Sequence, residues 1–233
     1  HFGDAWHRAA TLELKDDAAG FRGASIVDYD LDYFVNVASA EFAAGKTVRD
    51  HHALSVCYPV DLENRYSGNW PPFLLDLMPQ GHARRKLAEH LSLAEGSRAS
   101  DLPLLLRSAT GGIGNIRIKE ASDEETERLR GVERQGVTEV EIRERSDRFM
   151  EVADRFGMLA SGSSGLQGEW PKVSMTQADN GLYYPDSFVR DDEAVRHIIV
   201  KLVRSNEPVD RLILEGEALY SRIAREIGLN VHE

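Results

Sequence analysis

The chain has 233 residues, and 39 acidic residues against 28 lysines and arginines give it a formal net charge of −11. No uncharged apolar run reaches the roughly 18 residues of a membrane span, and the single cysteine, Cys57, excludes a disulfide framework. The acidic balance disfavours extended contact with nucleic-acid phosphates, and no secretory signal is visible, so we expect a cytoplasmic protein without membrane contact.

Short strands are predicted in the first half of the chain. Alternating apolar and polar residues predict strands over 11–15 and 24–30, and 53–60 is a further candidate. Three glycines between Gly111 and Gly114 lead into another predicted strand over 115–119. A dinucleotide-binding fingerprint needs its glycines between a strand and a helix, so this reversed order excludes a Rossmann site.

Two helices are predicted between these strands. Pro71 and Pro72 suit the first turn of the first helix, which Pro79 then ends. The second helix, over 83–91, is basic. We expect its cluster of Arg84, Arg85 and Lys86 to form a solvated face.

A domain boundary is predicted in the most charged stretch of the chain. Residues 121–136 contain few apolar residues and are typical of a linker or a solvated helix. We therefore expect an N-terminal domain over 1–135 and a second domain over 136–233. The second domain would begin with a helix over 138–157, because an apolar stripe runs along it at helical spacing.

The C-terminal part follows a definite order. A Gly/Ser-rich turn over 161–165 leads into a strand, and Asn180-Gly181 predicts a hairpin turn. An apolar strand over 196–203 contains one lysine. A long amphipathic helix ends at Gly228, and its apolar side contains Leu212, Leu219, Ile223 and Ile227.

This order matches the nucleotide-binding lobe of a protein kinase. There, a glycine-rich loop lets backbone N–H groups approach phosphates, a strand lysine neutralises phosphate charge, and a helix glutamate orients that lysine. Lys201 and Glu217, sixteen residues apart, are the candidate pair, although Glu215 is on the same helix. The plainer interpretations are that Lys201 is a solvated edge-strand residue and that the Gly/Ser stretch is a linker.

Other candidate sites are weaker. His51 and His52 are adjacent, and on a strand they would point to opposite faces, so we expect no metal site formed by protein ligands alone. Ser163 and Ser164 lack a nearby His–Asp pattern, which argues against an acyl-transfer nucleophile.

Three segments resemble the HipA family of Ser/Thr kinase toxins from bacterial toxin–antitoxin pairs. The segment "PPFLLDLMPQGHARRKLAEHL" is similar to the family's N-terminal signature, with Gln80 in place of the usual glutamate. The segment "GSSGLQGEWPKVSM" looks like its glycine-rich loop with the Pro-Lys pair. "HIIVKLV" followed by "EGEALYSRIAREIGLNV" resembles its lysine strand and the next helix.

The resemblance implies an α+β fold, in which a β-rich N-terminal subdomain packs on a kinase-like N-lobe. It also implies ATP and Mg²⁺ as ligands, and autophosphorylation of the loop at Ser164, or Ser163 next to it. The nucleotide-binding residues that it implies are Gly165, Gly168, Glu169, Lys172, Lys201 and Glu217. The catalytic aspartate of the family belongs to a helical C-lobe, so we expect no catalytic residue in this chain.

The leading hypothesis is therefore the N-terminal part of a HipA-like kinase that phosphorylates a protein Ser or Thr. The resemblance implies a helix-turn-helix (HipB-like) antitoxin as partner, DNA contact only through that antitoxin, and an aminoacyl-tRNA synthetase as one class of substrate. Two alternatives stay open. The chain could be a non-catalytic interaction module that binds an antitoxin or a separate C-lobe, or an unrelated α+β domain.

Overall fold

A computed structural model describes residues 1, 5–94, 96–110, 114–159, 172–203, 205 and 207–231, with side chains other than those of 82 and 154–159. Two small antiparallel sheets and a set of helices confirm the expected α+β class. The chain divides into two compact units, His1–Arg134 with Asp154–Gln167 and Gln135–Ala153 with Gly168–Glu233. None of the described helices is long and apolar enough to cross a bilayer.

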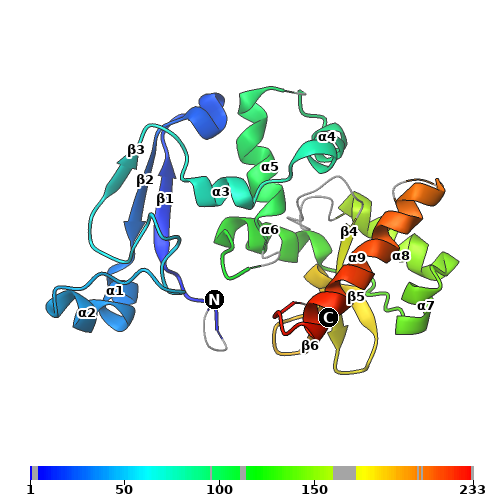
Figure 1. Ribbon diagram of the computed structural model, residues 1–233. Helices are drawn as coiled ribbons and strands as arrows, with labels where there is room; N and C mark the ends of the chain where they lie inside the picture. Colours follow the sequence, from blue (N-terminus) through cyan, green and yellow to red (C-terminus); the bar gives the residue numbers. More distant parts are fainter. Residues whose placement is uncertain are drawn as a thin grey trace. The chain divides into compact units, whose positions relative to one another are not determined.

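The sheet of the first unit confirms the two strands that alternation predicted (Figure 1). Its antiparallel strands follow the order β1 (Ala10–Leu14), β2 (Ser25–Tyr29) and β3 (Arg65–Ser67). Val27 in the central strand is opposite both Leu12 and Arg65. Alternate residues of β2 are buried, so one face of the sheet packs on the interior.

The prediction of a strand over 53–60 is wrong. This segment makes turns, with an isolated bridge between Ser55 and Tyr58. Two of its backbone groups bond to one side chain, because the Tyr29 hydroxyl accepts from the Leu54 N–H at 2.8 Å and donates to the Tyr58 carbonyl at 2.5 Å. Apolar composition favoured a strand here, but the hydrogen bonds that a ladder needs are used locally.

Helices supply most of the first unit. The α-helices are α1 (Leu31–Val37), α2 (Ser39–Ala43), α3 (Pro72–Asp76), α4 (Gly81–His90), α5 (Asp101–Ser108) and α6 (Lys119–Leu129), and the 3₁₀ helices are η1 (Asp17–Arg22) and η2 (Arg98–Ser100). One hydrophobic cluster of this unit contains Trp70, Leu74, Met78, Leu87, Leu104 and Leu105. A second contains Tyr29, Tyr33, Phe34, Val48, Ala53 and Val60.

Two expectations around α6 need correction. Residues 114–118 form no strand, and the Ile118 N–H instead bonds to the carbonyl of Ala109, the residue that ends α5. The charged stretch after it forms α6, so the helix alternative is right, but the helix is not solvated all round, since Ala121 and Glu125 are buried. Charge composition could not reveal which side of the helix packs against α5.

A buried carboxylate joins three elements of the first unit. Asp101, whose side chain is 1% exposed, accepts from the Arg84 guanidinium of α4 and from the Phe21 N–H of η1 at 3.0 Å. Arg84 is therefore an internal ion-pair partner, and the expectation that it is solvated is wrong. Gly20 lies directly against this carboxylate with φ +57°, and a Cβ there would come within 2.1 Å of Asp101 Oδ2.

The second unit contains the other sheet. Its antiparallel strands follow the order β5 (Tyr183–Pro185), β4 (Lys172–Ala178) and β6 (Ala194–Lys201). Asn180 and Gly181 make the turn between β4 and β5, as predicted, and Gly181 has φ +81°. The remaining elements of the chain are η3 (Asp186–Phe188), α7 (Glu139–Arg143), α8 (Asp147–Leu159) and α9 (Pro208–Glu226), and α8 belongs to this unit up to Ala153.

The single helix predicted over 138–157 is two helices in the structure. Thr138 starts α7 with a capping box to Glu141, and Arg145, with φ +52°, separates α7 from α8. The break changes the phase of the apolar stripe, so Val140 is exposed while Phe149 and Val152 are buried. Val137 pairs with Tyr183 through two 2.8 Å backbone hydrogen bonds, which attach the start of this segment to β5.

We predict that Gly20→Ala destabilises the chain by at least about 2 kcal/mol, because a methyl group would meet both the Asp101 carboxylate and the Arg98 carbonyl. Gly45→Ala is the matched control, since Gly45 has φ +72° with nothing within 4 Å of its Cβ position. The control should cost only about 1 kcal/mol. Urea denaturation measures both, and equal losses would contradict the role given to the Asp101 contact.

We predict that Tyr29→Phe costs about 1–3 kcal/mol, because the Leu54 N–H and the Tyr58 carbonyl both lose their partner. Burial raises the pKa of Tyr29 to about 12, and that of Tyr33 likewise to about 12. The neutral phenols therefore stabilise the folded state below about pH 10, and this contribution is lost as the pH rises toward 12. The stability of Tyr29→Phe should fall less steeply between pH 9 and about pH 12 than that of the wild type; parallel curves would contradict the assignment.

Candidate functional site

The structure brings Lys201 and Glu217 together. Lys201 is the last residue of β6, and its Nζ donates to Oε1 of Glu217 on α9. The side chains are 38% and 51% exposed, so the ion pair is accessible to solvent and to a ligand. An exposed pair of this kind contributes at most about 1 kcal/mol to the stability of the fold. A purely stabilising role therefore explains the pair poorly.

The helix geometry decides between the two candidate glutamates. Glu215 lies two positions before Glu217 and therefore projects in a different direction from α9. It forms an ion pair with Arg211 one turn earlier, at 2.8 Å. Pro208 stands in the first turn of this helix, and the buried Asp210 accepts a 2.6 Å hydrogen bond from the Ser205 hydroxyl, which holds the start of α9. The Lys201 partner is thus Glu217.

A second lysine lies opposite the first across the sheet. Lys172 in β4 is the register partner of Lys201 in β6, so the two side chains project from the same face. Like charges directly opposite each other in an antiparallel pair are destabilising unless anions compensate them. The Glu217 carboxylate supplies one negative charge at this end of the sheet.

The same sheet face carries an unsatisfied hydroxyl. Ser174 follows Lys172 by two residues and so shares its face, and its buried Oγ has no hydrogen-bond partner among the described residues. Buried polar groups in folded proteins are normally hydrogen-bonded, so this oxygen suits a ligand. Two lysines and a donor hydroxyl on one face can bind an anion with several acceptor oxygens. Strand alternation from Lys172 could have identified Ser174 in the sequence.

Further along this face, three polar side chains contact one another. The Thr176 hydroxyl donates to the Asp186 carboxylate, and His197 Nδ1 lies 2.8 Å from Thr176 Oγ1 and 3.1 Å from Asp186 Oδ1. Thr176 and Asp186 both meet the same ring nitrogen, so the group is not a nucleophile–histidine–acid relay, which uses both nitrogens. It connects η3 to β4 and β6 and was not predicted.

The predicted loop residues Ser163, Ser164, Gly165, Gly168 and Glu169 lie outside the described residues. Their contacts with a nucleotide and the phosphorylation of the serines therefore stay predictions. The described part of the predicted site consists of Lys172, Lys201 and Glu217.

An open apolar groove of about 680 Å³ runs along α9. It is lined by Leu212, Ile213, Gly216, Glu217, Tyr220, Ser221, Ala224 and Val231. The predicted apolar side of this helix is exposed rather than packed, since Leu212, Leu219, Ile223 and Ile227 are all solvent-accessible. Gly228, with φ +82°, ends the helix as expected. Glu217 thus belongs both to the ion pair and to this groove.

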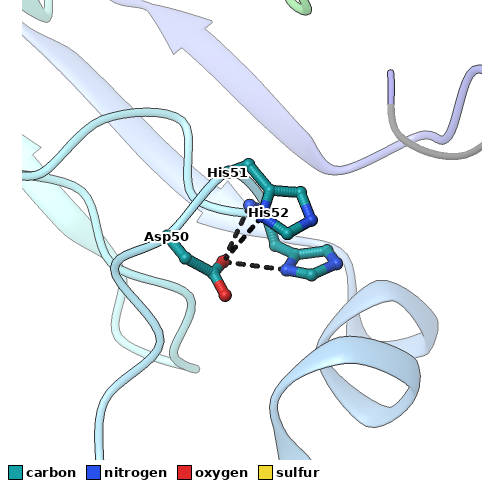
Figure 2. A group of neighbouring side chains, drawn as sticks. All are labelled: Asp50, His51 and His52. Carbon is teal, nitrogen blue, oxygen red and sulfur yellow. Dashed lines mark hydrogen bonds and ion pairs between the residues drawn. The ribbon is translucent and has the colours of Figure 1, made fainter.

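The two adjacent histidines do not behave as the sequence predicted. They lie in a turn rather than on a strand, and their rings are 3.9 Å apart at an interplanar angle of 39°. Figure 2 shows both imidazoles beside the carboxylate of Asp50. The expectation that they point to opposite faces is wrong because alternation applies only to extended backbone.

These features define an α+β protein with a strand lysine, a helix glutamate and a second lysine on one small sheet. Residues 35–119 match a family model described as the HipA N-terminal domain. This part of the chain is therefore similar to the N-terminal domain of the HipA family, which is associated with toxin–antitoxin systems. Comparisons with curated proteins and with solved structures gave no match.

Proposed function

We propose that this chain is the N-terminal part of a HipA-type Ser/Thr protein kinase, in which the second unit binds ATP. The observation that carries the proposal is the Lys201–Glu217 ion pair between β6 and α9. In protein kinases a strand lysine contacts the nucleotide phosphates and a helix glutamate positions it, and both must be in place for activity. The family match lies within the first unit and the pair lies in the second, so the pair supports the kinase proposal independently.

Each described residue has a distinct role in this proposal. Lys201 neutralises phosphate charge, and Glu217 positions its ammonium group. Lys172 supplies a second cation on the same sheet face, and the Ser174 hydroxyl, which has no partner among the described residues, donates to a phosphate oxygen. A bound phosphate chain would meet two ammonium groups and a hydroxyl on one sheet face, so the residues present fit the ligand.

The bound nucleotide would supply the transferable γ-phosphoryl group, and Mg²⁺ would balance its charge. Among the described residues of this face, Glu217 is occupied by Lys201 and Asp186 by Thr176. We therefore assign the Mg²⁺ ligands and the catalytic aspartate to the helical C-lobe that the family resemblance implies. The role of this chain is to bind and orient the phosphates.

The partner and the substrate are proposed at the level of class. A helix-turn-helix (HipB-like) antitoxin would bind the protein and mediate any contact with DNA. The substrate would be a protein Ser or Thr, with aminoacyl-tRNA synthetases as the class that the family resemblance implies. The chain's net charge of −11 agrees with DNA contact through a partner rather than directly.

A second candidate function is a non-catalytic interaction module. The exposed apolar side of α9 favours it, because a groove lined by leucine, isoleucine and tyrosine suits a protein partner better than a nucleotide. Under this proposal the chain binds an antitoxin or a separate C-lobe, and the Lys201–Glu217 pair only holds α9 against the sheet.

We predict that Lys201→Ala weakens MgATP binding to the 233-residue chain by at least about tenfold, equivalent to about 1.4 kcal/mol. Lys172→Ala should weaken it by a smaller factor. Lys119→Ala should leave it unchanged, since Lys119 is an exposed lysine of the first unit that pairs with Asp123. Isothermal titration calorimetry measures the MgATP affinity of the wild-type chain and of these three variants.

The exchange variant Lys201→Glu with Glu217→Lys separates charge placement from stability. It keeps an ion pair between the same two positions, so the melting temperature should stay near that of the wild type, yet MgATP should bind as weakly as to Lys201→Ala. Antitoxin binding by a wild-type chain that does not bind MgATP would instead establish the interaction module.

We predict that Ser164→Asp lowers the affinity for MgATP while Ser164→Ala does not. A phosphate on Ser164 adds about −1.5 to −2 charges to the loop, which would repel the nucleotide phosphates, and aspartate imitates part of that charge. Calorimetry with both variants measures the effect. Equal affinities of the two variants would contradict a regulatory role of this serine.

A further inference from the structure

One turn of the first unit brings three metal-ligating side chains together. Asp50, His51 and His52 follow one another in the sequence, and one ligand atom from each lies within 4.8 Å of the other two. Nδ1 of His52 lies 2.8 Å from Oδ1 of Asp50, and Nδ1 of His51 lies 4.0 Å from the same oxygen (Figure 2). The turn is far from the proposed nucleotide residues in the sequence and belongs to the other unit.

These distances suit a tetrahedral metal ion. Zinc binds histidine nitrogen and carboxylate oxygen at about 2.0–2.2 Å, which places neighbouring ligand atoms about 3.4 Å apart. The observed separations of 2.8 Å and 4.0 Å fall on either side of this value. Side-chain rotations that move the ligand atoms by less than about 1.5 Å would therefore complete the tetrahedral geometry, with water as the fourth ligand.

The backbone of the turn is held in place by its neighbours. The residues on either side, Val48 and Ala53, are buried in the same hydrophobic cluster, and Val48 pairs with Val60. The buried Tyr33 donates its hydroxyl to the His52 carbonyl at 2.7 Å. The turn is thus preorganised, so that binding needs only the three side chains to adjust.

Charge and access also favour a cation. The N–H of His52 donates to Asp50 Oδ1 at 2.9 Å, which holds this carboxylate oxygen beside the histidines. The side chains of Asp50 and His51 are more than half exposed, whereas that of His52 is 22% exposed, so an ion can enter from solvent. Two imidazoles and one carboxylate favour borderline ions over Mg²⁺ or Ca²⁺, which prefer oxygen ligands.

We propose that Asp50, His51 and His52 form a binding site for a divalent transition-metal ion, with Zn²⁺ as the ion of choice. The ion would join the three side chains and stabilise the turn between Val48 and Ala53. This site is independent of the proposed kinase function, because it uses none of the residues assigned to ATP.

The test uses Zn²⁺ and the intact 233-residue chain. Isothermal titration calorimetry should show one equivalent of Zn²⁺ bound with a dissociation constant on the order of micromolar, as expected for three ligands in place of four. Co²⁺ in place of Zn²⁺ should give visible absorption bands of tetrahedral intensity, which report directly on the ligand geometry.

Three variants and one control locate the site. His51→Ala, His52→Ala and Asp50→Asn should each weaken Zn²⁺ binding about tenfold or more and remove the Co²⁺ bands. His90→Ala, at the exposed end of α4, should bind Zn²⁺ like the wild type. Because His51 is largely exposed, His51→Ala keeps the test valid even if His52→Ala unfolds, as circular dichroism would show.

Two results would overturn the proposal. One is the absence of saturable Zn²⁺ binding to the wild-type chain up to about 100 µM, well above the expected dissociation constant. The other is unchanged affinity in the double variant His51→Ala with His52→Ala, which would place the bound ion elsewhere.

Discussion

The antiparallel pairing of β4 with β6 is the constraint on which the candidate nucleotide site depends. Its register places Lys172 opposite Lys201, and the two-residue period of the strands then puts Ser174 on the same face. A shift of β4 by one residue would turn Lys172 to the other face of the sheet, away from Lys201. Met175, which is fully buried, opposes such a shift because it would bring a large apolar side chain to the polar face.

The first unit depends on a comparable constraint of a different kind. Asp101 is a buried carboxylate, and burial of a charge is unfavourable unless it is paired and hydrogen-bonded. Arg84 and the Phe21 N–H meet that need, so η1, α4 and α5 are joined through one side chain. Loss of one partner would leave an uncompensated charge in the interior, which costs more than the loss of an exposed pair such as Lys201–Glu217.

The two units carry different kinds of support for function. The family match lies in the first unit and identifies the HipA N-terminal domain. The lysine–glutamate pair lies in the second unit and supports nucleotide binding through its geometry. The apolar groove along α9 is also lined by Glu217, so a polypeptide bound there would contact the ion-pair partner of Lys201.

The sequence by itself determined the features that depend on local pattern. These include the first two strands, the Asn180-Gly181 turn, the helix that ends at Gly228, and the spacing between Lys201 and Glu217. Tertiary structure alone decided that Arg84 is paired, that residues 53–60 form turns, and that Asp50, His51 and His52 converge. The reason is physical: periodicity and turn residues act over a few positions, whereas the partner of a buried charge or a hydrogen-bonding group is supplied by residues distant in the sequence. The turn that brings Asp50, His51 and His52 together is likewise held by a distant residue, Tyr33.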